Sequence, residues 1–522
     1  MAALFLIGFM ASGKTTIGRR LAELTKRPFV DLDDVIAQSI GEPVAELVMR
    51  DEPAFRRRET EALREVISRG DLVVATGGGC GANPANVALM RAAGTAIALG
   101  VEVGEARERA KGGGERPLLA NADVLAKARA SAYRRAHAVV PTTGKPIEDV
   151  VAQVFAVERL AQQYHDATIL SLEKRSYPIV VRDQLADPLR TSWGASSKVA
   201  VITDRNVAAH WKLPRTNADI GEVVEIAIEP GEASKSFASY AALCNELVAR
   251  GLDRGSVIVA FGGGVVGDLA GFVAATLFRG IDFVQVPTTI VAMTDAAIGG
   301  KTAIDLPAGK NLVGAFHQPW VVDCALETLE TLPARERRAG FGELWKYALL
   351  DGPQLWRDVA SCASWSRDGG EMPAAFREVM RASIAYKAEV VGRDERERTG
   401  VRALLNLGHT VGHAIESASG MLHGEAVALG LVAAARVSSA LLGTRADLER
   451  ELIEGLQASG LSVDIDRWLD DSMGDVLARV AVDKKRVGNT LKYIAIRDVG
   501  DCEPVEIDVT ELRRILRSKP TA

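Results

Sequence analysis

A glycine-rich segment close to the start of the chain has the residue types and spacing needed to bind phosphate. Gly8 and Gly13 are separated by four residues and followed by Lys14 and Thr15, directly after the apolar run 3–7. In such a loop, main-chain N–H groups and a helix N-terminus cradle phosphate oxygens, the lysine reaches the outer phosphates and the hydroxyl holds Mg²⁺. The pattern predicts a nucleoside triphosphate site with Thr15 as the Mg²⁺ ligand, formed by Ala11, Ser12, Gly13, Lys14, Thr15 and Thr16.

Charged side chains follow the next elements of the same region. Asp31 and Asp33 come directly after the apolar run 28–30, where both carboxylates would point toward the phosphate loop. Three glycines at 112–114 precede Arg116 and suit a mobile lid. Phosphoryl transfer requires Mg²⁺ and cationic side chains that neutralise developing charge. Further candidates for the substrate site are Arg56, Gly78 and Arg129.

A second group of candidate residues lies about 400 residues further along and has the composition of a metal site. His409 and His413 are four residues apart and share one helix face, and His423 and Glu343 complete the group. The chain has seven histidines in all, so three within fifteen residues are conspicuous. Three protein ligands and an open position are typical of catalytic Zn²⁺. Spacing alone leaves open which three of these four residues bind.

Polar residues also follow several strand patterns between these two groups. Asp204 and Asn206 follow one strand, and Thr288 and Thr289 follow another; segment 262–268, Gly-Gly-Gly-Val-Val-Gly-Asp, follows a third. Polar groups at the carboxyl ends of neighbouring strands form the crevice in which dinucleotides bind. The glycines have an alternative explanation, because they also let a helix pack close to a strand. The pattern therefore favours a cofactor crevice without proving one.

Several basic residues near these candidates suggest an anionic substrate. Lys301, Lys310 and Asn311 lie near glycine-rich turns. The alternative to an anion-binding role is that this segment is a solvated loop. Lys346 follows Glu343 by three residues and shares its helix face. Other residues of this kind are Lys387, Arg402 and Asn406.

The elements that must position these residues form an α/β protein of about three domains. Apolar runs at 72–76 and 95–99 predict buried parallel strands in the first part, and runs at 198–203, 256–261 and 283–287 predict strands in the second. After about residue 325, strand patterns fade and helical patterns predominate. We expect a parallel α/β/α phosphate-loop domain at 1–157, a linker at 158–168, an α/β dinucleotide-binding domain at 169–325 and an all-helical domain at 326–522.

Composition indicates which kinds of partner the protein binds and in which compartment it acts. The net charge is −5, which argues against nucleic-acid binding, and no stretch approaches the uninterrupted apolar length that spans a membrane. The five cysteines are scattered and form no CxxC pair, as in a cytoplasmic protein with reduced thiols. We therefore expect a cytoplasmic enzyme with small-molecule substrates.

Residues 1–157 resemble shikimate kinase, on the phosphate loop and the ordered acidic and arginine residues named above. The resemblance implies phosphorylation of shikimate by ATP with Mg²⁺. Asp33 would then accept the hydroxyl proton, and Arg116 would close over ATP. The shikimate carboxylate and hydroxyls would be held by Arg56, Gly78 and Arg129. An adenine contact near Lys145 cannot be assigned.

Residues from about 168 onward resemble 3-dehydroquinate synthase. The resemblance implies that Glu343, His409 and His423 bind Zn²⁺ or Co²⁺, that Asp295 lies near the reacting centre, and that Asp483–Lys485 matches a late lysine pair. It implies a catalytic and substrate-binding group of Lys301, Lys310, Asn311, Lys346, Lys387, Glu397, Arg402, Asn406 and His413. It implies NAD contacts from Asp204, Asn206, Glu232, Lys235, Gly264, Val265, Val266, Gly267, Asp268, Thr288, Thr289, Lys301, Lys310, Thr328, Leu329, Glu330 and Thr331.

Together the two resemblances imply a bifunctional shikimate-pathway enzyme that also converts a heptulosonate phosphate to 3-dehydroquinate and phosphate. A homodimer through the second part is implied as well. The alternative is a phosphate-loop kinase of another small molecule fused to a metal-dependent polyol dehydrogenase. The lysine-rich group argues against that alternative, because a neutral alcohol needs no phosphate-binding cage.

Overall fold

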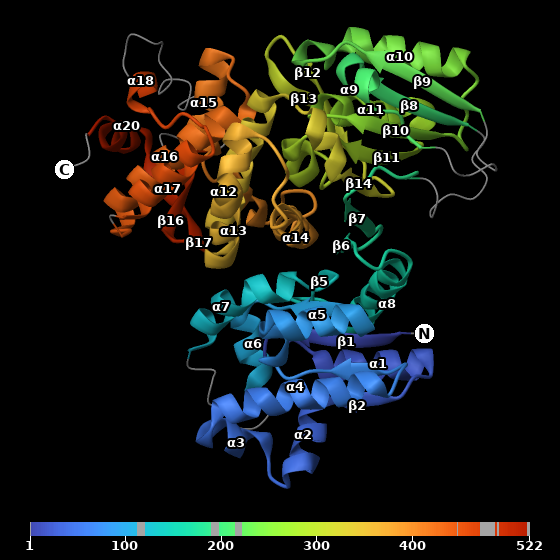
Figure 1. Cartoon of the computed structure of the whole chain (residues 1–522), viewed down its shortest axis with the longest axis vertical. Coiled ribbons are helices and arrows are strands. Elements are labelled where there is room, and N and C mark those ends of the chain that lie inside the picture. Colours follow the sequence, from blue (N-terminus) through green and yellow to red (C-terminus); the bar gives the residue numbers. More distant parts are fainter. Residues whose placement is uncertain are drawn as a thin grey trace. The chain divides into compact units, whose positions relative to one another are not determined.

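The structure is a computed structural model that describes residues 2–111, 121–188, 198–214, 222–445, 447–469, 486–487 and 490–518 (Figure 1). It divides into two compact units. The first comprises Met1–Val180 with Ala388–Glu395, and the second comprises Val181–Lys387 with Arg396–Ala522.

The first unit is built on a parallel sheet with strand order β2-β3-β1-β4-β5. Its central strand β1 is buried along its whole length, as expected for a strand covered by helices on both faces. The strands are β1 (Ala3–Gly8), β2 (Phe29–Asp31), β3 (Val73–Ala75), β4 (Gly94–Gly100) and β5 (Ala138–Pro141). Strands β6 (Thr168–Leu170) and β7 (Tyr177–Arg182) follow and pair antiparallel with each other.

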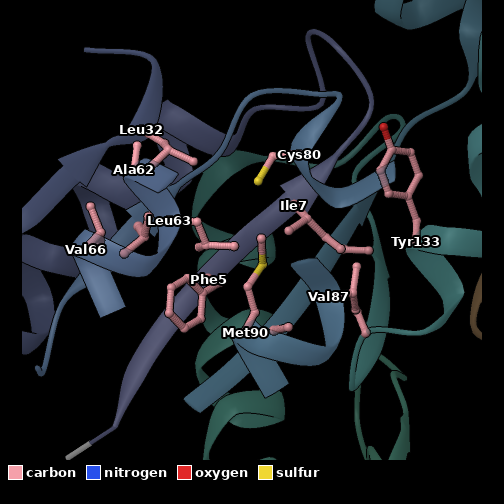
Figure 2. Close-up of a cluster of buried hydrophobic side chains, with 14 of the residues drawn as sticks. Phe5, Ile7, Leu32, Ala62, Leu63, Val66, Cys80, Val87, Met90 and Tyr133 are labelled. Carbon is pink, nitrogen blue, oxygen red and sulfur yellow. The ribbon is translucent and has the colours of Figure 1, made fainter. Parts of the chain in front are cut away.

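Side chains alternate across β1 and give each face of the sheet its own core. Phe5 and Ile7 point into a buried cluster with Leu63 and Met90 (Figure 2). Leu6 points to the opposite face, where α1 packs at Gly18. The helices are α1 (Lys14–Thr25), α2 (Leu32–Ile40), α3 (Val44–Arg50), α4 (Glu52–Ser68), α5 (Pro84–Ala93), α6 (Val103–Ala110), α7 (Ala122–Arg134) and α8 (Ile147–Gln163), with the 3₁₀ turn η1 (Cys80–Ala82).

Helix α8 continues beyond the predicted domain boundary at residue 157, so the first residues of the expected linker 158–168 are helical. The buried stripe Val150, Val154, Val157 and Ala161 continues at helical spacing through this point. Glu158 also forms a buried ion pair with Arg27 at 2.6 Å, which fixes the last turns of the helix to the unit.

The second unit contains parallel strands in the order β14-β11-β10-β8-β9. Helix α11 covers one face, where Leu269 and Val273 lie in a core with Ile258 and Phe283. A separate antiparallel hairpin is formed by β12 and β13. The elements of this half are β8 (Val199–Asp204), α9 (Arg205–His210), β9 (Val223–Ile228), η3 (Glu232–Ser234), α10 (Phe237–Ala249), β10 (Val257–Gly262), α11 (Gly264–Thr276), η4 (Leu277–Arg279), β11 (Asp282–Pro287), the π-helix η5 (Ala292–Ala296), β12 (Lys301–Leu306), β13 (Gly309–Phe316), β14 (Val322–Ala325) and η6 (Leu326–Thr331).

The rest of the chain is mainly helical. Its elements are α12 (Ala334–Asp351), α13 (Pro353–Asp368), α14 (Phe376–Arg393), η7 (Val401–Asn406), α15 (His409–Ser419), α16 (His423–Leu442), α17 (Asp447–Ala458), α18 (Asp466–Leu469), β15 (Arg486–Val487), β16 (Thr490–Asp498), β17 (Asp501–Asp508) and α20 (Val509–Arg517).

Helix α16 is long and apolar enough to cross a membrane by length and composition. Within the unit, however, 67% of its apolar stretch is buried, and it packs against α12, α15 and α17. It is therefore a core helix of a globular domain.

The predicted α/β class and its order along the chain are confirmed, and the expected strands correspond to β1, β3, β4, β8, β10 and β11. The structure differs from the prediction in two places. The segment around Lys301 and Lys310 is the β12–β13 hairpin rather than a loop, and the helical part expected to contain no strands includes the sheet β15-β16-β17. In β16, Leu491 and the run Tyr493–Ile496 are buried, and the strand packs on α16.

Candidate active sites

The phosphate loop is held in a closed turn between β1 and α1. Gly13 has φ 96°, a left-handed conformation that favours glycine. The Lys14 ammonium is buried and donates to the main-chain oxygens of Gly8 at 3.0 Å and Phe9 at 2.8 Å. The Thr15 hydroxyl donates to Asp31 Oδ2 at 2.9 Å. The lysine, the hydroxyl and an acidic residue therefore meet at the N-terminus of α1, as the sequence predicted.

Asp33 lies beside this loop in surroundings that favour its protonated form. Burial, with the nearby Asp31 carboxylate, raises the pKa of Asp33 to about 6. Asp33 Oδ1 is buried and has no hydrogen-bond partner. A Cβ added at Gly77 would lie 2.7 Å from this oxygen and 2.9 Å from Glu59 Oε1, so the glycine leaves space between two carboxylates. An aspartate with these properties is suited to accept a proton from a bound hydroxyl.

The other predicted substrate residues of the first unit lie around the same space. Arg56 forms an ion pair with the buried Glu59 at 2.6 Å, and a Cβ at Gly79 would overlap its guanidinium. A Cβ at Gly78 would lie 3.7 Å from Arg129 Nη1, and the Gly78 carbonyl accepts from Tyr133 at 2.6 Å. The structure thus brings together Asp33, Arg56, Gly78 and Arg129. Arg116 and the glycines 112–114 lie outside the described residues.

Polar and charged side chains of the second unit gather at the carboxyl ends of β8, β10 and β11. Asp204 caps α9 by accepting from Asn206 N at 2.8 Å. Lys235 is buried and pairs with Asp268 Oδ2 at 2.9 Å and Glu232 Oε1 at 3.3 Å. Burial raises the pKa of Asp268 to about 6 although Lys235 opposes this shift. A charged cluster therefore lies where α11 begins.

Glycines bring α11 close to the sheet. A Cβ at Gly263 would lie 3.2 Å from Thr289, and a Cβ at Gly267 would lie 2.8 Å from Gln285 Oε1. The packing explanation of the glycine-rich segment therefore holds at Gly267, and its contact with a dinucleotide stays a prediction. Thr288 N donates to Gly262 O at 3.0 Å and joins the ends of β11 and β10.

Some predicted dinucleotide contacts are buried in ways that the motif did not indicate. The side chains of Val266 and Leu329 are buried in the core and leave only main-chain atoms for a ligand. Thr328 turns inward and donates to Ala325 O at 2.7 Å. Thr331 and Glu330 are exposed, and Thr331 Oγ1 accepts from Trp211 Nε1 at 2.6 Å. Gly264 and Val265 are half-buried at the start of α11.

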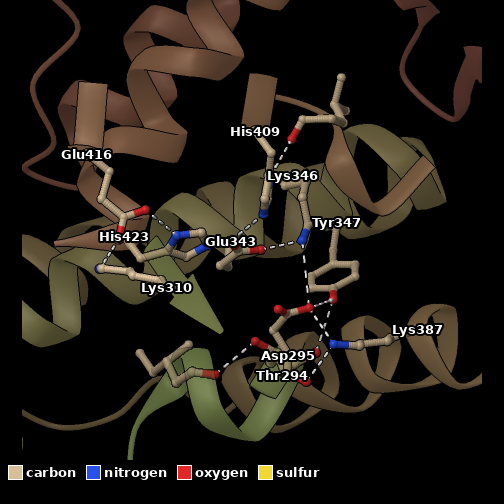
Figure 3. A network of polar contacts seen from close by, with 12 residues as sticks. Thr294, Asp295, Lys310, Glu343, Lys346, Tyr347, Lys387, His409, Glu416 and His423 are labelled. Atoms are coloured by element: carbon tan, nitrogen blue, oxygen red, sulfur yellow. Dashed lines mark hydrogen bonds and ion pairs between the residues drawn. The ribbon is translucent and has the colours of Figure 1, made fainter. Parts of the chain in front are cut away.

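The predicted metal residues converge from α12, α15 and α16 (Figure 3). Glu343 Oε1 lies 3.5 Å from His409 Nε2 and 3.1 Å from His423 Nε2. One ring nitrogen from each of His409, His413 and His423 lies within 4.8 Å of the others. His409 Nδ1 bonds the main-chain oxygen of Leu407 at 3.0 Å, which leaves Nε2 facing Glu343. All four candidates therefore surround one point.

Electrostatics at this point fit a divalent cation. Burial and the Lys346 ammonium lower the pKa of His409 well below its ordinary value, so its imidazole is neutral and able to ligate. Burial lowers the pKa of His423, but hydrogen bonds to Glu343 and Glu416 outweigh it and raise that pKa to about 10. The carboxylates of Glu343 and Glu416 thus place negative charge on both sides of the His423 imidazole, and a bound cation would balance this charge.

Close helix packing makes this convergence possible. A Cβ at Gly342 on α12 would lie 2.0 Å from Gly424 O, and a Cβ at Gly424 on α16 would lie 1.8 Å from Ala339 O. The backbones of α12 and α16 therefore touch at these two glycines. Each glycine is the immediate neighbour of a proposed ligand, Glu343 or His423, so the contact places both ligands within reach of each other.

A second polar network lies beside the metal residues. Lys387 donates to Asp295 Oδ1 and to Asp295 O, and Tyr347 donates to the same carboxylate at 3.0 Å. Lys346 lies 2.5 Å from Glu343 Oε2 and 3.9 Å from Asp295 Oδ1, and so links the two groups. Burial lowers the pKa of Lys387 to about 8, although Asp295 opposes this shift. Burial raises the pKa of Asp295, but Lys387 and Lys346 outweigh it and keep it well below its ordinary value.

The remaining predicted residues lie on the hairpin and on η7. Lys301 pairs with Glu397 at 2.5 Å, and Arg402 lies 3.6 Å from the same carboxylate. The Lys310 ammonium binds Glu416 at 2.7 Å. Asn311 accepts from Lys235. Asn406 is half-buried at the end of η7, whereas Asp483–Lys485 lie outside the described residues.

Three residues of these sites were not singled out from the sequence, namely Glu59, Tyr347 and Glu416. Asp31, which was expected to point toward the phosphate loop, binds the Thr15 hydroxyl, and Tyr347 binds Asp295. Glu59 and Glu416 pair with predicted site residues. Two signals could have found some of them: Glu59 follows Arg56 by three residues and Glu416 follows His413 by three, the spacing that puts side chains on one helix face.

Comparisons with known proteins match the first part of the chain and the rest of it to different families. Residues 10–158 match the shikimate kinase family model, residues 225–339 match that of the 3-dehydroquinate synthase N-terminal domain, and residues 340–486 match that of its C-terminal domain. The 3-dehydroquinate synthase of Caulobacter vibrioides is 44% identical over 348 residues, which cover 64% of this chain and 92% of the relative. That of Opitutus terrae is 45% identical over 342 residues, covering 64% and 92%.

A solved structure of 2-deoxy-scyllo-inosose synthase complexed with carbaglucose-6-phosphate, NAD⁺ and Co²⁺ shares the fold of the larger part. Its TM-score is 0.59 at 24% identity, and the match covers 67% of this chain and 99% of that protein. The chain therefore belongs to the 3-dehydroquinate synthase family and carries a shikimate kinase domain ahead of its synthase part.

Proposed function

We propose that the chain catalyses two reactions of the shikimate pathway at separate sites. The first is phosphorylation of shikimate by ATP, and the second is conversion of 3-deoxy-D-arabino-heptulosonate 7-phosphate to 3-dehydroquinate and phosphate. The observation that carries the synthase proposal is the convergence of Glu343, His409 and His423 beside a network of lysines. The lysines also favour it over the polyol dehydrogenase, whose neutral substrate needs no cationic group.

In the kinase site, the residues of the loop bind and orient the phosphates. The Lys14 ammonium lies at the loop carbonyls and would bind the outer phosphates, and the Thr15 hydroxyl, held by Asp31, would ligate Mg²⁺. Asp33 takes the proton of the attacking shikimate hydroxyl. The pKa of about 6 leaves Asp33 ionised and sufficiently basic near neutral pH. Arg56, Gly78 and Arg129 hold the shikimate carboxylate and hydroxyls, and Arg116 closes over ATP.

In the synthase site, Glu343, His409 and His423 would hold Zn²⁺ or Co²⁺, and the charged cluster at Asp268 would hold NAD⁺. When bound, NAD⁺ supplies reversible hydride removal and the cation supplies charge that polarises an alcohol oxygen. The NAD contacts that we propose are Asp204, Asn206, Glu232, Lys235, Gly264, Val265, Val266, Gly267, Asp268, Thr288, Thr289, Lys301, Lys310, Thr328, Leu329, Glu330 and Thr331, with Val266 and Leu329 acting through their main chains.

The basic residues around this site bind the substrate anion and move protons. Lys387, with a pKa of about 8, exchanges a proton with the substrate near neutral pH while Asp295 holds its ammonium in place. Lys346 is fixed between Glu343 and Asp295 and orients the substrate next to the metal residues. The phosphate and carboxylate contacts that we assign are Lys301, Lys310, Asn311, Arg402, Asn406 and His413, with Glu397 positioning Lys301 and Arg402.

A direct test measures both activities of the purified full-length chain with each substrate separately. We expect ADP formation with shikimate and not with gluconate or a nucleoside monophosphate. We also expect phosphate release from the heptulosonate phosphate without net accumulation of NADH, because the cofactor is regenerated in each turnover. Net NADH formation without phosphate release would instead support the polyol dehydrogenase.

The organisation of the protein forms a further part of the proposal. We assign the kinase to the domain at 1–157, NAD binding to 169–325 and metal and substrate binding to 326–522. We also propose that the chain forms a homodimer through the synthase part and acts in the cytoplasm on small molecules. Sedimentation of the full-length chain and of a chain starting near residue 169 tests the dimer.

A further inference from the structure

Glu416 lies between a proposed metal ligand and a lysine from a different part of the second unit. It is on α15, one turn after His413, and its side chain is 12% exposed. Its Oε2 lies 3.0 Å from His423 Nδ1, and its Oε1 lies 2.7 Å from Lys310 Nζ. Figure 3 shows Glu416 between these two partners, which come from the start of α16 and from β13.

The contact with His423 decides which ring nitrogen faces the cation. A neutral imidazole carries one N–H, and a carboxylate beside Nδ1 fixes the proton there. The lone pair is then on Nε2, which lies 3.1 Å from Glu343 Oε1. His409 follows the same rule with a different partner, since its Nδ1 bonds the Leu407 carbonyl. Such partners of ligating histidines contribute strongly to metal affinity in other proteins.

The contact with Lys310 has a separate effect. The Lys310 side chain is 53% exposed, and a lysine on an exposed strand ordinarily extends into water. Glu416 instead holds its ammonium next to the metal residues. One carboxylate therefore uses its two oxygens to orient a ligand on α16 and a cation on the β12–β13 hairpin.

We propose that Glu416 is a positioning residue of the synthase site, which directs His423 Nε2 toward the divalent cation and holds Lys310 beside it. This inference rests on the proposed metal site. It concerns a residue that touches neither the cation nor the reacting atoms, so its effect should be seen in metal binding itself and not only in turnover.

The test compares metal binding by full-length variants after removal of bound metal. Glu416→Gln keeps the shape of the side chain and removes its charge. We expect its affinity for Zn²⁺, measured by competition with a chromophoric chelator, to fall about 10- to 100-fold. The absorption spectrum of the Co²⁺ form should change in shape, which a general loss of stability would not cause.

Two further variants separate the contacts. Lys310→Met removes the other partner of Glu416 and should leave Zn²⁺ affinity within about twofold of the parent chain while raising KM for the phosphorylated substrate. Glu451→Gln removes a carboxylate on α17 that is paired with Arg445 and should change neither quantity. If Glu416→Gln folds poorly, Glu416→Asp keeps the charge but shortens the reach, and it should still weaken Zn²⁺ binding.

The outcomes distinguish this inference from the proposed function. If the parent chain binds no Zn²⁺ or Co²⁺, the metal site and the inference both fail. If the parent binds the metal and Glu416→Gln and Glu416→Asp bind it equally well with unchanged Co²⁺ spectra, the role of Glu416 is wrong and the metal site stands.

Discussion

The Lys387 ammonium donates to two oxygens of Asp295, the carboxylate Oδ1 and the main-chain oxygen, each at 2.5 Å. Asp295 lies in the π-helical turn η5, a local geometry that is often associated with functional sites. Its carboxylate also accepts from Tyr347 and faces Lys346. Asp295 is therefore the carboxylate that balances the buried Lys387 ammonium, whereas Lys346 has Glu343 as a closer partner.

Replacement of Asp295 by Asn should destabilise the protein strongly. The variant leaves Lys387 buried without its counter-charge, whereas Lys346 keeps Glu343 as a partner. Breaking such a buried pair costs about 3–5 kcal/mol. Tyr347→Phe is the matched comparison, since it removes one hydrogen bond to the same carboxylate and should cost about 1–2 kcal/mol. Urea unfolding followed by tryptophan fluorescence measures both. Equal losses in the two variants would contradict the charge-balance argument.

Replacement of Asp33 by Asn should abolish the kinase and stabilise its domain at pH 7. The folded-state pKa of about 6 lies above the ordinary value of 3.8, so the folded chain binds this proton more tightly than the unfolded chain. That contribution is complete below about pH 4 and is lost as the pH rises through 6. The variant avoids the cost of ionising a buried carboxyl, which amounts to about 1–3 kcal/mol.

Thermal unfolding of both proteins at several pH values checks this prediction. The Tm of Asp33→Asn should exceed that of the parent at pH 7, and the difference should vanish below pH 4. The kinase rate of the parent should also fall as the pH decreases through about 6, because protonated Asp33 cannot accept the hydroxyl proton. A kinase rate that is level between pH 5 and 7 would argue against Asp33 as the base.

Gly77→Ala should damage the shikimate site without unfolding the domain. The added methyl would lie 2.7 Å from Asp33 Oδ1 and 2.9 Å from Glu59 Oε1, so these side chains must move. We expect kcat/KM for shikimate to fall at least about tenfold, since small displacements of positioned groups reduce rates strongly. Gly104→Ala is the control, because a methyl group there meets no atom within 4 Å. Similar kinetics for both variants would show that Gly77 does not shape the site.

Lys14→Ala should abolish the kinase and leave the synthase unchanged. The lysine is the principal cation of the phosphate loop, and loss of such a charge typically reduces kcat by about 10²–10³-fold. Steady-state rates of both reactions in the same preparation provide the measurement. Loss of both activities in a folded protein would refute independence of the two sites.

Removal of divalent metal should abolish the synthase and spare the kinase once Mg²⁺ is restored, which is the reverse of the effect expected for Lys14→Ala. A chelator followed by Mg²⁺ should restore the kinase, which needs Mg²⁺ at Thr15, but not the synthase. Zn²⁺ or Co²⁺ should then restore phosphate release. If metal-free protein releases phosphate from the heptulosonate phosphate at the full rate, the assignment of Glu343, His409 and His423 is wrong.

The sequence predicted those parts of the sites that lie next to each other along the chain. The phosphate loop, the polar residues after β8, β10 and β11, and the pair His409 and His413 all follow from short spacings whose geometry is local. Contacts between distant segments were not accessible. Glu416 meets Lys310 across 106 residues, and Tyr347 meets Asp295 across 52, because helix packing and the β12–β13 hairpin set their register.

Burial could not be predicted from the sequence alone. The resemblance implied a dinucleotide contact at Leu329, but the 3₁₀ turn η6 points its side chain into the core and leaves only its main chain for a ligand. The same limit applies to β16, whose buried run Tyr493–Ile496 packs on the distant helix α16. The sequence pattern shows which residues are apolar, but the helix or strand that packs on them decides which of these side chains are buried.

The backbone contact between α12 and α16 affects how natural sequence variants of this protein should be interpreted. Gly342 and Gly424 have no side chain, and a survey of side-chain chemistry would pass over both. Yet even a methyl group at either position would force the two helices apart and separate Glu343 from His423. An alanine at residue 342 or 424 in a sequenced isolate should therefore be interpreted as a loss-of-function allele, on a par with deletion of a ligand.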